Sequence, residues 1–522
     1  MAEPTGAPAA FDVVVDVLVV GSGGGVAGAY TAAREGLSVL LAEATDMFGG
    51  TTAYSGGGGM WYPCNPVLRR AGTDDTLEEA LRYFHGVVGD RTPRDLQDTY
   101  VTGGSPFIEY LEQDPAFAFT VLPWPDYYGS VPGARADGYR HIVPVPLADA
   151  ELGRYAGLIR GPLDTERLGA PVPETLIGGR ALVGRFLAAL NRYDAAEAWR
   201  NAALTDLIVD ADTVVGAVLD RDGRALRVGA RRGVLLAAGG FERDAEMRER
   251  YRVAGSATDT MGAPGNTGAA HRAAIAVGAD TDLMDQAWWS PGLSHPDGHS
   301  AFALLFTGGI FVDRFGHRFV NESAPYDRLG REVIRALKRD RLRLPFWMVY
   351  DSRAGDTPPI GATNVSMVDP ARYREAGLWH SADTLDELAT AIGVPGTELE
   401  ATVRRFNEFA RTGTDADFSR GGEPYDRAVT AGGSPLVPLD TPPYHAAAFG
   451  LSDLGTKGGL RTDNRGRALR ADGTAIRGLY AAGNTMAAVS GTTYPGGGNP
   501  IGASLLFSHL AALDMASGAA PR

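Results

Sequence analysis

The chain has 522 residues but a single cysteine, Cys64, so it cannot form an internal disulfide. This excludes the small disulfide-stabilised domains of secreted proteins and favours a reducing compartment. Residues 1–16 also lack the basic segment followed by an apolar segment that is typical of a secretory signal. We therefore expect a cytoplasmic location.

Long apolar runs are missing as well. The most apolar stretch, residues 501–515, is interrupted by polar side chains such as Ser508 and Asp514. A membrane-spanning helix needs about 18 or more consecutive apolar residues, so we expect no membrane span. Positive charge is also scarce, because the net charge is −14 at pH 7. This argues against a nucleic acid partner, since phosphates attract a basic surface.

Motifs of metalloenzymes and hydrolases do not occur in the sequence. The nine histidines are scattered without an H-E-x-x-H pattern or a C-x-x-C pair, and we expect no metal site. A G-x-S-x-G nucleophile elbow is also missing. We found no repeat of 20 to 50 residues, which excludes solenoids and propellers.

Glycine, in contrast, is abundant. The 69 glycines are about twice the usual share of ~7%, and they are bunched rather than periodic. Bunched glycines indicate loops in which the backbone comes close to a ligand, because no Cβ atom stands in the way. The remaining composition is that of an ordinary globular protein.

The first glycine cluster lies in a predicted strand–turn–helix–strand unit over residues 16–43. Gly21 and Gly23 occupy the first two positions of a G-x-G-x-x-G fingerprint, and a second register of the same spacing uses Gly25 as its middle glycine. Glu43 ends the second strand, where an acidic residue binds a ribose hydroxyl. The unit therefore predicts a dinucleotide site.

A second cluster, GGTTAYSGGGG at residues 49–59, indicates which dinucleotide is bound. Its six glycines and its hydroxyl groups provide enough donors to surround a pyrophosphate and to reach a flavin ring. This suits the extended FAD molecule better than NAD. We expect the following residues of this cluster to bind the cofactor: Gly50, Thr51, Thr52, Ser55, Gly57 and Gly58.

Two later segments complete the same unit. Residues 213–241 predict a hairpin followed by an apolar strand, and residues 478–484 predict a further strand that leads into a helix with Pro500 in its first turn. The free amides at that helix start suit the electron-rich edge of a reduced flavin. We expect cofactor contacts from Ala238, Gly239, Asn484 and Ile501.

We therefore predict an α/β fold with a Rossmann-type FAD-binding domain formed by residues 10–285 and 446–522. Residues 286–445 are expected to form an inserted α+β catalytic domain, with the active site between the two domains. One helix of the insertion is predicted to start with a capping box made by Thr397 and Glu400.

Three segments carry tyrosines in distinctive surroundings: PWPDYYGS with Tyr127 and Tyr128, NESAPYDR with Tyr326, and TTYPGGG with Tyr494. A phenol is a poor base because its reference pKa is about 10. Most of the 19 tyrosines of the chain are therefore expected to serve packing.

Several segments together resemble the flavin-dependent 3-oxosteroid (3-ketosteroid) Δ1-dehydrogenases of the fumarate reductase/succinate dehydrogenase flavoprotein superfamily. The specific motifs are NESAPYDRLGRE and YPGGG followed by IGASLLF, while GLYAAGN and the N-terminal fingerprint are shared more widely. GTKGGLRTDNRGRALR is also similar. The likeness extends from the fingerprint to the last helix.

The resemblance implies removal of hydrogens from C1 and C2 of a 3-ketosteroid, with a hydride passing to flavin N5 and electrons then passing to an external acceptor. It implies that Tyr326 is the base and that Tyr127 assists it, with Tyr128 as the alternative. It also implies that the Tyr494 hydroxyl and the Gly498 amide bind the ketone oxygen and stabilise enolate charge.

Other readings stay open at this point. The chain departs from the family pattern at Asn499 and Pro500, which leaves a different cyclic ketone as an alternative substrate. A fumarate or enoate reductase is a second alternative, but that branch has an arginine at the position of Tyr326. A flavoprotein without turnover is a third. Trp288, Trp289, Phe302 and Phe306 are expected to line the cleft and would suit a flat apolar ligand, although each could equally be a core residue.

Overall fold

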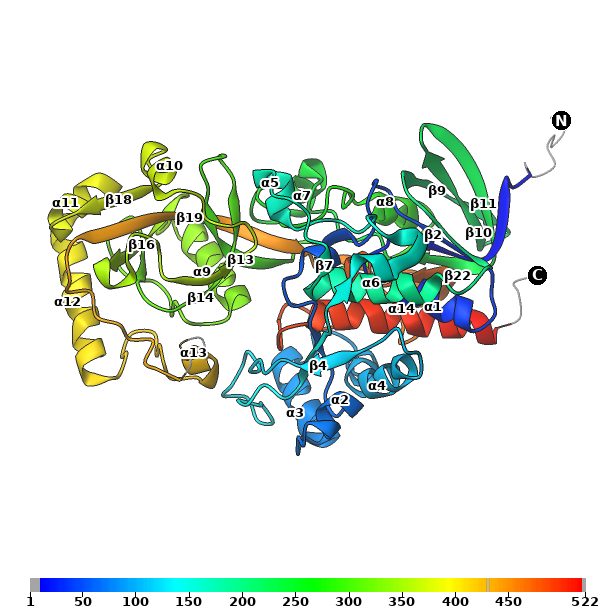
Figure 1. Cartoon of the computed structure of the whole chain (residues 1–522), viewed down its shortest axis with the longest axis horizontal. Helices are drawn as coiled ribbons and strands as arrows, with labels where there is room; N and C mark the ends of the chain where they lie inside the picture. The colour runs from blue at the N-terminus through cyan, green and yellow to red at the C-terminus, as the bar shows by residue number, and fades with distance from the viewer. Residues whose placement is uncertain (1–9, 429, 431, 519–522) are drawn as a thin grey trace.

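The computed structural model describes residues 10–428, 430 and 432–518. Part of the N-terminal stretch used to predict a missing secretory signal, residues 1–9, lies outside the described residues. The molecule is elongated, with one large sheet in each of its two halves (Figure 1).

The first sheet is built around five parallel strands in the order β8-β2-β1-β11-β22. The second half of β1, residues 17–20, is almost completely buried, as expected of a parallel strand that is covered on both faces. The strands of this sheet are β1 (Val13–Val20), β2 (Val39–Ala42), β8 (Ala196–Trp199), β9 (Ala202–Asp210), β10 (Thr213–Arg221), β11 (Arg224–Leu236), β21 (Arg467–Leu469) and β22 (Ala475–Ala481).

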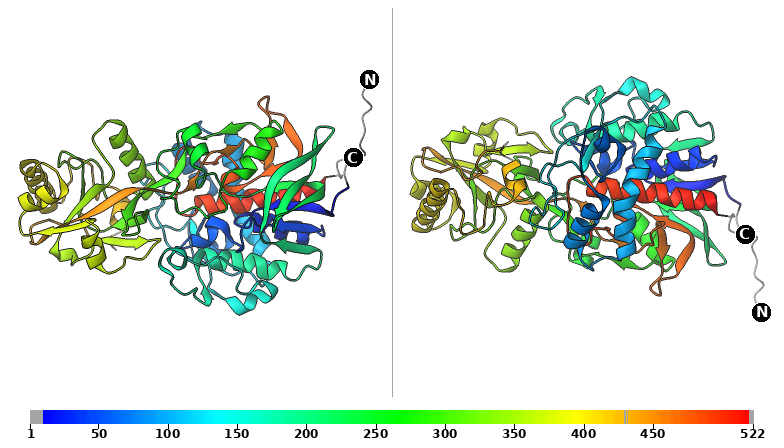
Figure 2. Two further views of the ribbon diagram at one scale, coloured as in Figure 1. Left: turned by 90° about the horizontal axis from the view of Figure 1, so that it is seen from above. Right: turned by 90° about the horizontal axis from the view of Figure 1, so that it is seen from below.

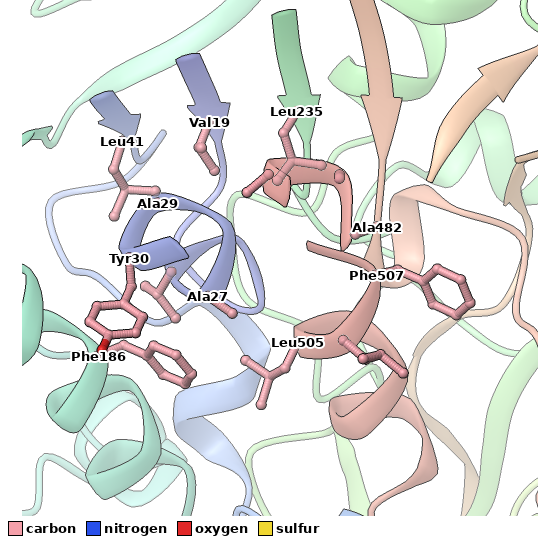
Figure 3. Close-up of a cluster of buried hydrophobic side chains, with 14 of the residues drawn as sticks. Val19, Ala27, Ala29, Tyr30, Leu41, Phe186, Leu235, Ala482, Leu505 and Phe507 are labelled. Atoms are coloured by element: carbon pink, nitrogen blue, oxygen red, sulfur yellow. The ribbon is translucent and has the colours of Figure 1, made fainter. Parts of the chain in front are cut away.

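Helices α1 (Gly25–Arg34), α6 (Gly178–Leu190) and α14 (Asn499–Ser517) pack together beside these strands. Figure 3 shows their shared core, in which Leu505 of α14 lies on the side of Ala27 of α1, while Phe507 projects from the opposite side of α14. Gly28 allows the close approach of α1 to β11, since a Cβ atom there would lie 2.5 Å from Leu235. Burial of such apolar side chains stabilises the fold by about 1.5–3 kcal/mol each.

The second sheet is antiparallel, in the order β15-β16-β19-β13-β14-β17, with β18 paired to β19. The long strand β19 runs from this sheet toward the middle of the molecule (Figure 1). The sheet therefore continues beyond residue 445, because β19 pairs along most of its length. Its strands are β13 (Ala287–Ser294), β14 (Ser300–Phe306), β15 (Ile310–Val312), β16 (Phe346–Asp351), β17 (Ile360–Thr363), β18 (Trp379–Ala382) and β19 (Tyr444–Thr456).

Smaller elements complete the fold. Short pairings are formed by β3 (Met60–Trp61), β4 (Phe119–Val121) and β5 (His141–Pro144), by β6 (Leu147–Ala148) and β7 (Thr175–Leu176), and by β12 (Thr281–Asp282) and β20 (Gly459–Leu460). The remaining helices are α2 (Pro66–Arg70), α3 (Leu77–Val88), α4 (Arg94–Glu112), α5 (Leu163–Leu168), α7 (Ala245–Tyr251), α8 (Ala269–Ala276), α9 (Tyr326–Lys338), α10 (Pro370–Glu375), α11 (Leu385–Ile392), α12 (Gly396–Thr412) and α13 (Pro424–Ala428).

The predicted capping box of the insertion is wrong. Helix α12 already begins at Gly396, so Pro395 occupies the N-cap position and no side chain caps the helix. The predicted apolar face is nevertheless present, because Leu399, Val403 and Phe406 are buried in one cluster.

The fold brings the carboxyl ends of β1, β2, β11 and β22 to the same edge of the first sheet. Helix α14 lies along the middle of that half in both views of Figure 2. In open α/β sheets ligands bind outside the carboxyl ends of the strands. Within the described part of the chain, no helix combines the length and the apolar character that crossing a bilayer requires.

Candidate active site

A cavity of about 560 Å³ lies at this edge of the first sheet and continues toward the second sheet. Its walls contain the ends of β1 and β2, the starts of α1 and α14, and residues of β13, β14 and β17. Of the residues predicted to contact the cofactor, those that line the cavity are Gly21, Gly23, Glu43, Gly50, Thr51, Thr52, Ser55, Gly57, Ala238, Gly239, Asn484 and Ile501.

The glycine turn between β1 and α1 forms one end of the cavity. Gly21 has a φ of +100°, and a Cβ atom there would lie 2.2 Å from the carbonyl oxygen of Ala237. Gly24 is the N-cap of α1, and a Cβ atom there would collide with Ser504 of α14. The backbone therefore packs tightly at the start of α1, where free amides favour an anion such as a pyrophosphate.

Glu43 follows β2 and is buried at the cavity wall. One of its carboxylate oxygens accepts hydrogen bonds from the hydroxyl and the amide of Ser22, and the other accepts from the amide and the hydroxyl of Thr45. These four donors occupy the four lone-pair sites of the carboxylate and hold it in place at the cavity wall.

The second glycine cluster folds against the first. The amide of Gly49 donates to the Ser22 hydroxyl at 2.8 Å, and Thr51 accepts hydrogen bonds from the amide of Ala263 and the side chain of Asn266. A Cβ atom at Gly56 would meet no atom within 4 Å, so this stretch borders open space. We call the loops around Gly21, Gly50, Gly239 and Asn484 the glycine cradle.

Two predicted cofactor residues do not line the cavity. Gly25 lies inside the first turn of α1, where a Cβ atom would meet Val19 at 2.9 Å. Gly58 has a φ of +56°, and its Cβ position is taken by the backbone of Gly178. Both glycines are required by close packing of the protein itself.

The three tyrosine segments meet at the other end of the cavity. Tyr127, Tyr326 and Tyr494 all line it, and all three are buried. The ring centroids lie 5.0 Å apart for Tyr127 and Tyr494, 5.5 Å for Tyr326 and Tyr494, and 5.8 Å for Tyr127 and Tyr326. We call these three side chains the tyrosine cluster. Tyr128 does not line the cavity; the guanidinium of Arg328 covers its ring.

Backbone contacts hold the cluster together. The amide of Tyr127 and the hydroxyl of Tyr83 both donate to the carbonyl oxygen of Pro495. This ties the first tyrosine segment to the third. Asp126, the neighbour of Tyr127, accepts hydrogen bonds at 2.8 Å from the indole of Trp61 and from the guanidinium of Arg140.

A separate buried network supports Tyr326, which is the first residue of α9. The carboxylate of Glu322 pairs with Arg318 and Arg420, and Arg420 also donates to the hydroxyl of Ser323 at 2.9 Å. The NES part of the motif therefore fixes the loop that leads into α9. It does not itself line the cavity.

Burial governs the protonation of the cluster. It raises the pKa of Tyr326 and of Tyr127 above the ordinary value of a phenol, and neighbouring tyrosines add to the effect. Burial also raises the pKa of Tyr494, while the hydroxyl of Tyr326 and the backbone amide of Gly498 act in the opposite direction. At neutral pH all three side chains are therefore hydrogen-bond donors.

Gly498 is the N-cap of α14 and has a φ of +85°. A Cβ atom there would lie 2.5 Å from the carbonyl carbon of Gly59, so a larger residue would displace the backbone. Both Gly498 and Tyr494 line the cavity. The start of α14 therefore brings the Gly498 amide close to the Tyr494 hydroxyl, which are two hydrogen-bond donors on the same cavity wall.

Some cavity residues were not predicted from the sequence. His141 lines the cavity, donates a hydrogen bond from Nδ1 to the carbonyl oxygen of Leu122, and makes no hydrogen bond through Nε2 within the described residues. Burial lowers its pKa to about 4, so it is neutral at pH 7. Tyr425 does not line the cavity but packs edge-on against Tyr127, with the ring centroids 5.1 Å apart. Neither residue belongs to a motif that the sequence makes recognisable.

The charge of the cavity wall is informative about ligands. Among the described residues that line the cavity, none is lysine or arginine, and Glu43 is the only carboxylate. The tyrosine end is apolar, since Trp288 and Phe302 pack edge-on against Tyr494 and Tyr326, respectively. This end is suited to a neutral, flat molecule.

Comparison with known proteins agrees with this geometry. Residues 16–501 match the FAD binding domain family. The chain is 39% identical to the 3-oxosteroid 1-dehydrogenase of Mycobacterium tuberculosis strain H37Rv, over 97% of this chain and 99% of that protein. It is 34% identical to the 4-oxocyclohexanecarboxylate 2-dehydrogenase of Sinomonas cyclohexanicum, over 97% and 93% of the two chains.

A solved structure gives a similar result. The crystal structure of 3-ketosteroid Δ1-dehydrogenase from Sterolibacterium denitrificans in complex with 1,4-androstadiene-3,17-dione superimposes with a TM-score of 0.88. It shares 31% sequence identity, and the match covers 97% of this chain and 99% of that one.

Proposed function

Because the chain belongs to the 3-oxosteroid 1-dehydrogenase family of FAD-binding enzymes, we propose that it desaturates the C1–C2 bond of a 3-ketosteroid or of a similar neutral fused-ring ketone. The reaction breaks one C–H bond at C1 with loss of hydride and one at C2 with loss of a proton, and a C1=C2 double bond forms. The observation that carries the proposal is the buried tyrosine cluster that shares one cavity with the glycine cradle.

The cradle suits FAD. The starts of α1 and α14 both line the cavity, and the fixed carboxylate of Glu43 lies at its wall. An extended dinucleotide needs such donors at both ends. When bound there, FAD supplies the hydride acceptor of the reaction.

At the other end, the Tyr494 hydroxyl and the Gly498 amide act as paired donors to the ketone oxygen. Donors that are already in place stabilise negative charge on this oxygen and so acidify the C2 hydrogens. Tyr326 takes the C2 proton. Because burial keeps Tyr326 protonated before the reaction, its own proton must leave first, and the adjacent hydroxyl of Tyr127 provides the relay.

The absence of lysine and arginine among the described residues that line the cavity narrows the choice of substrate. The Sinomonas relative acts, by its name, on a ketone with a carboxylate, and dicarboxylate reductases must also bind carboxylates. A carboxylate at the tyrosine end would be desolvated without a cation from the described lining residues, which is unfavourable. We therefore favour a neutral ketone over a carboxylated one, and desaturation over fumarate reduction.

Three further points belong to the same proposal. The residues of the two sheets form an FAD-binding domain and an inserted catalytic domain, with boundaries near residue 285 and, because β19 continues to Thr456, near residue 456. An external acceptor removes the electrons after each turnover. The enzyme acts in the cytoplasm, for which the scarcity of cysteine is the support.

An anaerobic reduction assay tests the function. The FAD-loaded enzyme is mixed with 4-androstene-3,17-dione, and the yellow flavin absorbance is followed by stopped flow. We expect the absorbance to bleach and the product to be two mass units lighter, with the new double bond between C1 and C2. Bleaching by 4-oxocyclohexanecarboxylate but not by the steroid would refute the substrate class. Oxidation of the pre-reduced enzyme by fumarate alone would refute the reaction.

A further inference from the structure

Lysine is almost absent from this chain, which contains only Lys338 and Lys457 although it has 49 lysines and arginines in total. Lys338 is exposed near the end of α9, whereas Lys457 is completely buried directly after β19. Nearly every other cation is an arginine, so position 457 uses the compact ammonium group in a chain that otherwise uses the larger guanidinium. Lys457 does not line the cavity, and the chemistry proposed above leaves it without a role.

The contacts of Lys457 join the two segments that carry Tyr326 and Tyr494. Its Nζ donates a hydrogen bond of 2.9 Å to the carbonyl of Thr493, the residue before Tyr494. The same Nζ lies 3.5 Å from the carboxylate of Asp327, the residue after Tyr326. These segments are far apart in the sequence, and the ammonium group lies between them.

A third contact leads to the cavity itself. The Nζ of Lys457 lies 4.0 Å from the ring centroid of Trp288, in cation–π geometry. The edge of Trp288 in turn packs against Tyr494, with centroids 5.0 Å apart, and Trp288 lines the cavity. The backbone is fixed as well, because the amide of Lys457 donates to the carbonyl of Gln286.

Asp327 explains why a positive charge is needed here. Its side chain is 1% exposed. The negative charge of Asp327 acts to raise the pKa of Tyr494. The same charge therefore opposes negative charge on a ketone oxygen bound to Tyr494. Arg331 pairs with one oxygen of Asp327, and the other oxygen has no hydrogen-bond donor within the described residues except the nearby ammonium of Lys457. A buried carboxylate without a counter-charge would oppose enolate formation.

We propose that Lys457 is a positioning residue for the desaturation: it ties the Tyr326 and Tyr494 segments together and neutralises Asp327, so that negative charge can develop at the ketone oxygen. This inference rests on the function proposed above. Burial lowers the pKa of Lys457 to about 7, and Asp327 acts against that decrease. The charge of the lysine therefore depends on its carboxylate partner.

Single-turnover flavin reduction by 4-androstene-3,17-dione tests the proposal with the FAD-loaded enzyme. Lys457→Met keeps the length of the side chain and removes the charge. In this variant Asp327 keeps only its pair with Arg331, so more of its negative charge opposes the charge that develops at the ketone oxygen, and we expect reduction to slow about tenfold or more. The dissociation constant of the ketone should change less than about threefold. The matched variant Lys338→Met should reduce at the wild-type rate.

Charge rescue separates electrostatics from loss of packing. The double variant Lys457→Met/Asp327→Asn removes the opposed charge as well, and we expect it to be faster than Lys457→Met alone by about threefold or more. If the two substitutions only damaged packing, their effects would add, and the double variant would be slower than Lys457→Met. Wild-type rates in Lys457→Met, or a double variant slower than Lys457→Met, would overturn the proposal. If the wild-type enzyme itself is not bleached by the steroid, the proposed function fails, and that result is distinct.

Isotope labelling gives a second test that does not depend on the folding of a variant. With ¹³C-lysine incorporated, the wild-type holoenzyme has two lysine side chains to observe by NMR. Addition of 1,4-androstadiene-3,17-dione should shift the Cε signal of Lys457 and leave that of Lys338 in place. Equal responses of both signals, or no response of either, would contradict the inference.

Discussion

The glycine cradle and the tyrosine cluster occupy the two ends of one cavity, but they are built in different ways. The cradle is made largely of backbone, and its glycines are required because a Cβ atom would collide with neighbouring loops, as at Gly21 and Gly24. The cluster is made of side chains from three distant segments, and it depends on hydrogen bonds such as that from Tyr127 to Pro495. Binding of the cofactor and chemistry on the ketone should therefore be separable by mutation.

The largest effect is expected in the cradle. Gly21→Ala forces a side chain into a φ of +100° and places its Cβ 2.2 Å from a carbonyl oxygen. We expect loss of bound FAD and hence of all activity, measured by flavin absorbance after purification. Gly36→Ala is the matched control: its φ is +83°, but no atom lies within 4 Å of the Cβ position. If Gly21→Ala retains FAD as Gly36→Ala does, the cradle is assigned wrongly.

The next largest effect separates the two ends. Tyr494→Phe removes one of the two proposed donors to the ketone oxygen, and the loss of one such donor typically costs 10²- to 10³-fold in rate. We expect single-turnover reduction to slow by about this factor while FAD stays bound. An unchanged rate would show that the hydroxyl of Tyr494 does not touch the ketone.

A smaller effect distinguishes the two adjacent tyrosines. Tyr127 lines the cavity and Tyr128 does not. Tyr127→Phe interrupts the proposed proton relay, and we expect flavin reduction about 10- to 100-fold slower. Tyr128→Phe should stay within about twofold of the wild type. The reverse order would mean that the second tyrosine faces the ring in solution.

The smallest effect concerns the stability of the protein at His141. This residue lies between the glycine cradle and the tyrosine cluster, where it packs against Gly59 and near Trp124. Its pKa in the folded protein is lowered to about 4 by burial, from 6.5. As pH falls from 6.5 toward 4, only the unfolded chain takes up the proton, so the free energy of unfolding decreases by up to about 3 kcal/mol. We expect the Tm of His141→Gln to fall less over this range than that of the wild type. His299→Gln, at an exposed position, should follow the wild type.

The same contrast explains how much the sequence could predict. The cradle follows local rules, since a strand, a glycine turn and a helix start lie within a few residues of each other, and the motif predicted most of its lining. It also named Gly25 and Gly58, which do not line the cavity and whose Cβ positions are taken by neighbouring protein atoms. The fold class was also predicted, and the family membership confirms it.

The cluster could not be derived from local rules. No spacing in the sequence indicates that Tyr127, Tyr326 and Tyr494 meet, and their predicted roles rested on resemblance to a family. The choice between Tyr127 and Tyr128 depends on a hydrogen bond to Pro495 from another segment. His141 and Lys457 were missed because their surroundings come from residues far away in the chain.

The most direct test of the account is single-turnover flavin reduction by 4-androstene-3,17-dione in Tyr326→Phe, with the FAD content measured in parallel. Phenylalanine keeps the ring packing against Phe302 and Tyr494 but cannot accept the C2 proton. The account predicts full FAD occupancy and a reduction rate at least about 10³-fold below that of the wild type. A variant that is reduced at the wild-type rate would show that the proton leaves C2 by another route and would contradict the central claim.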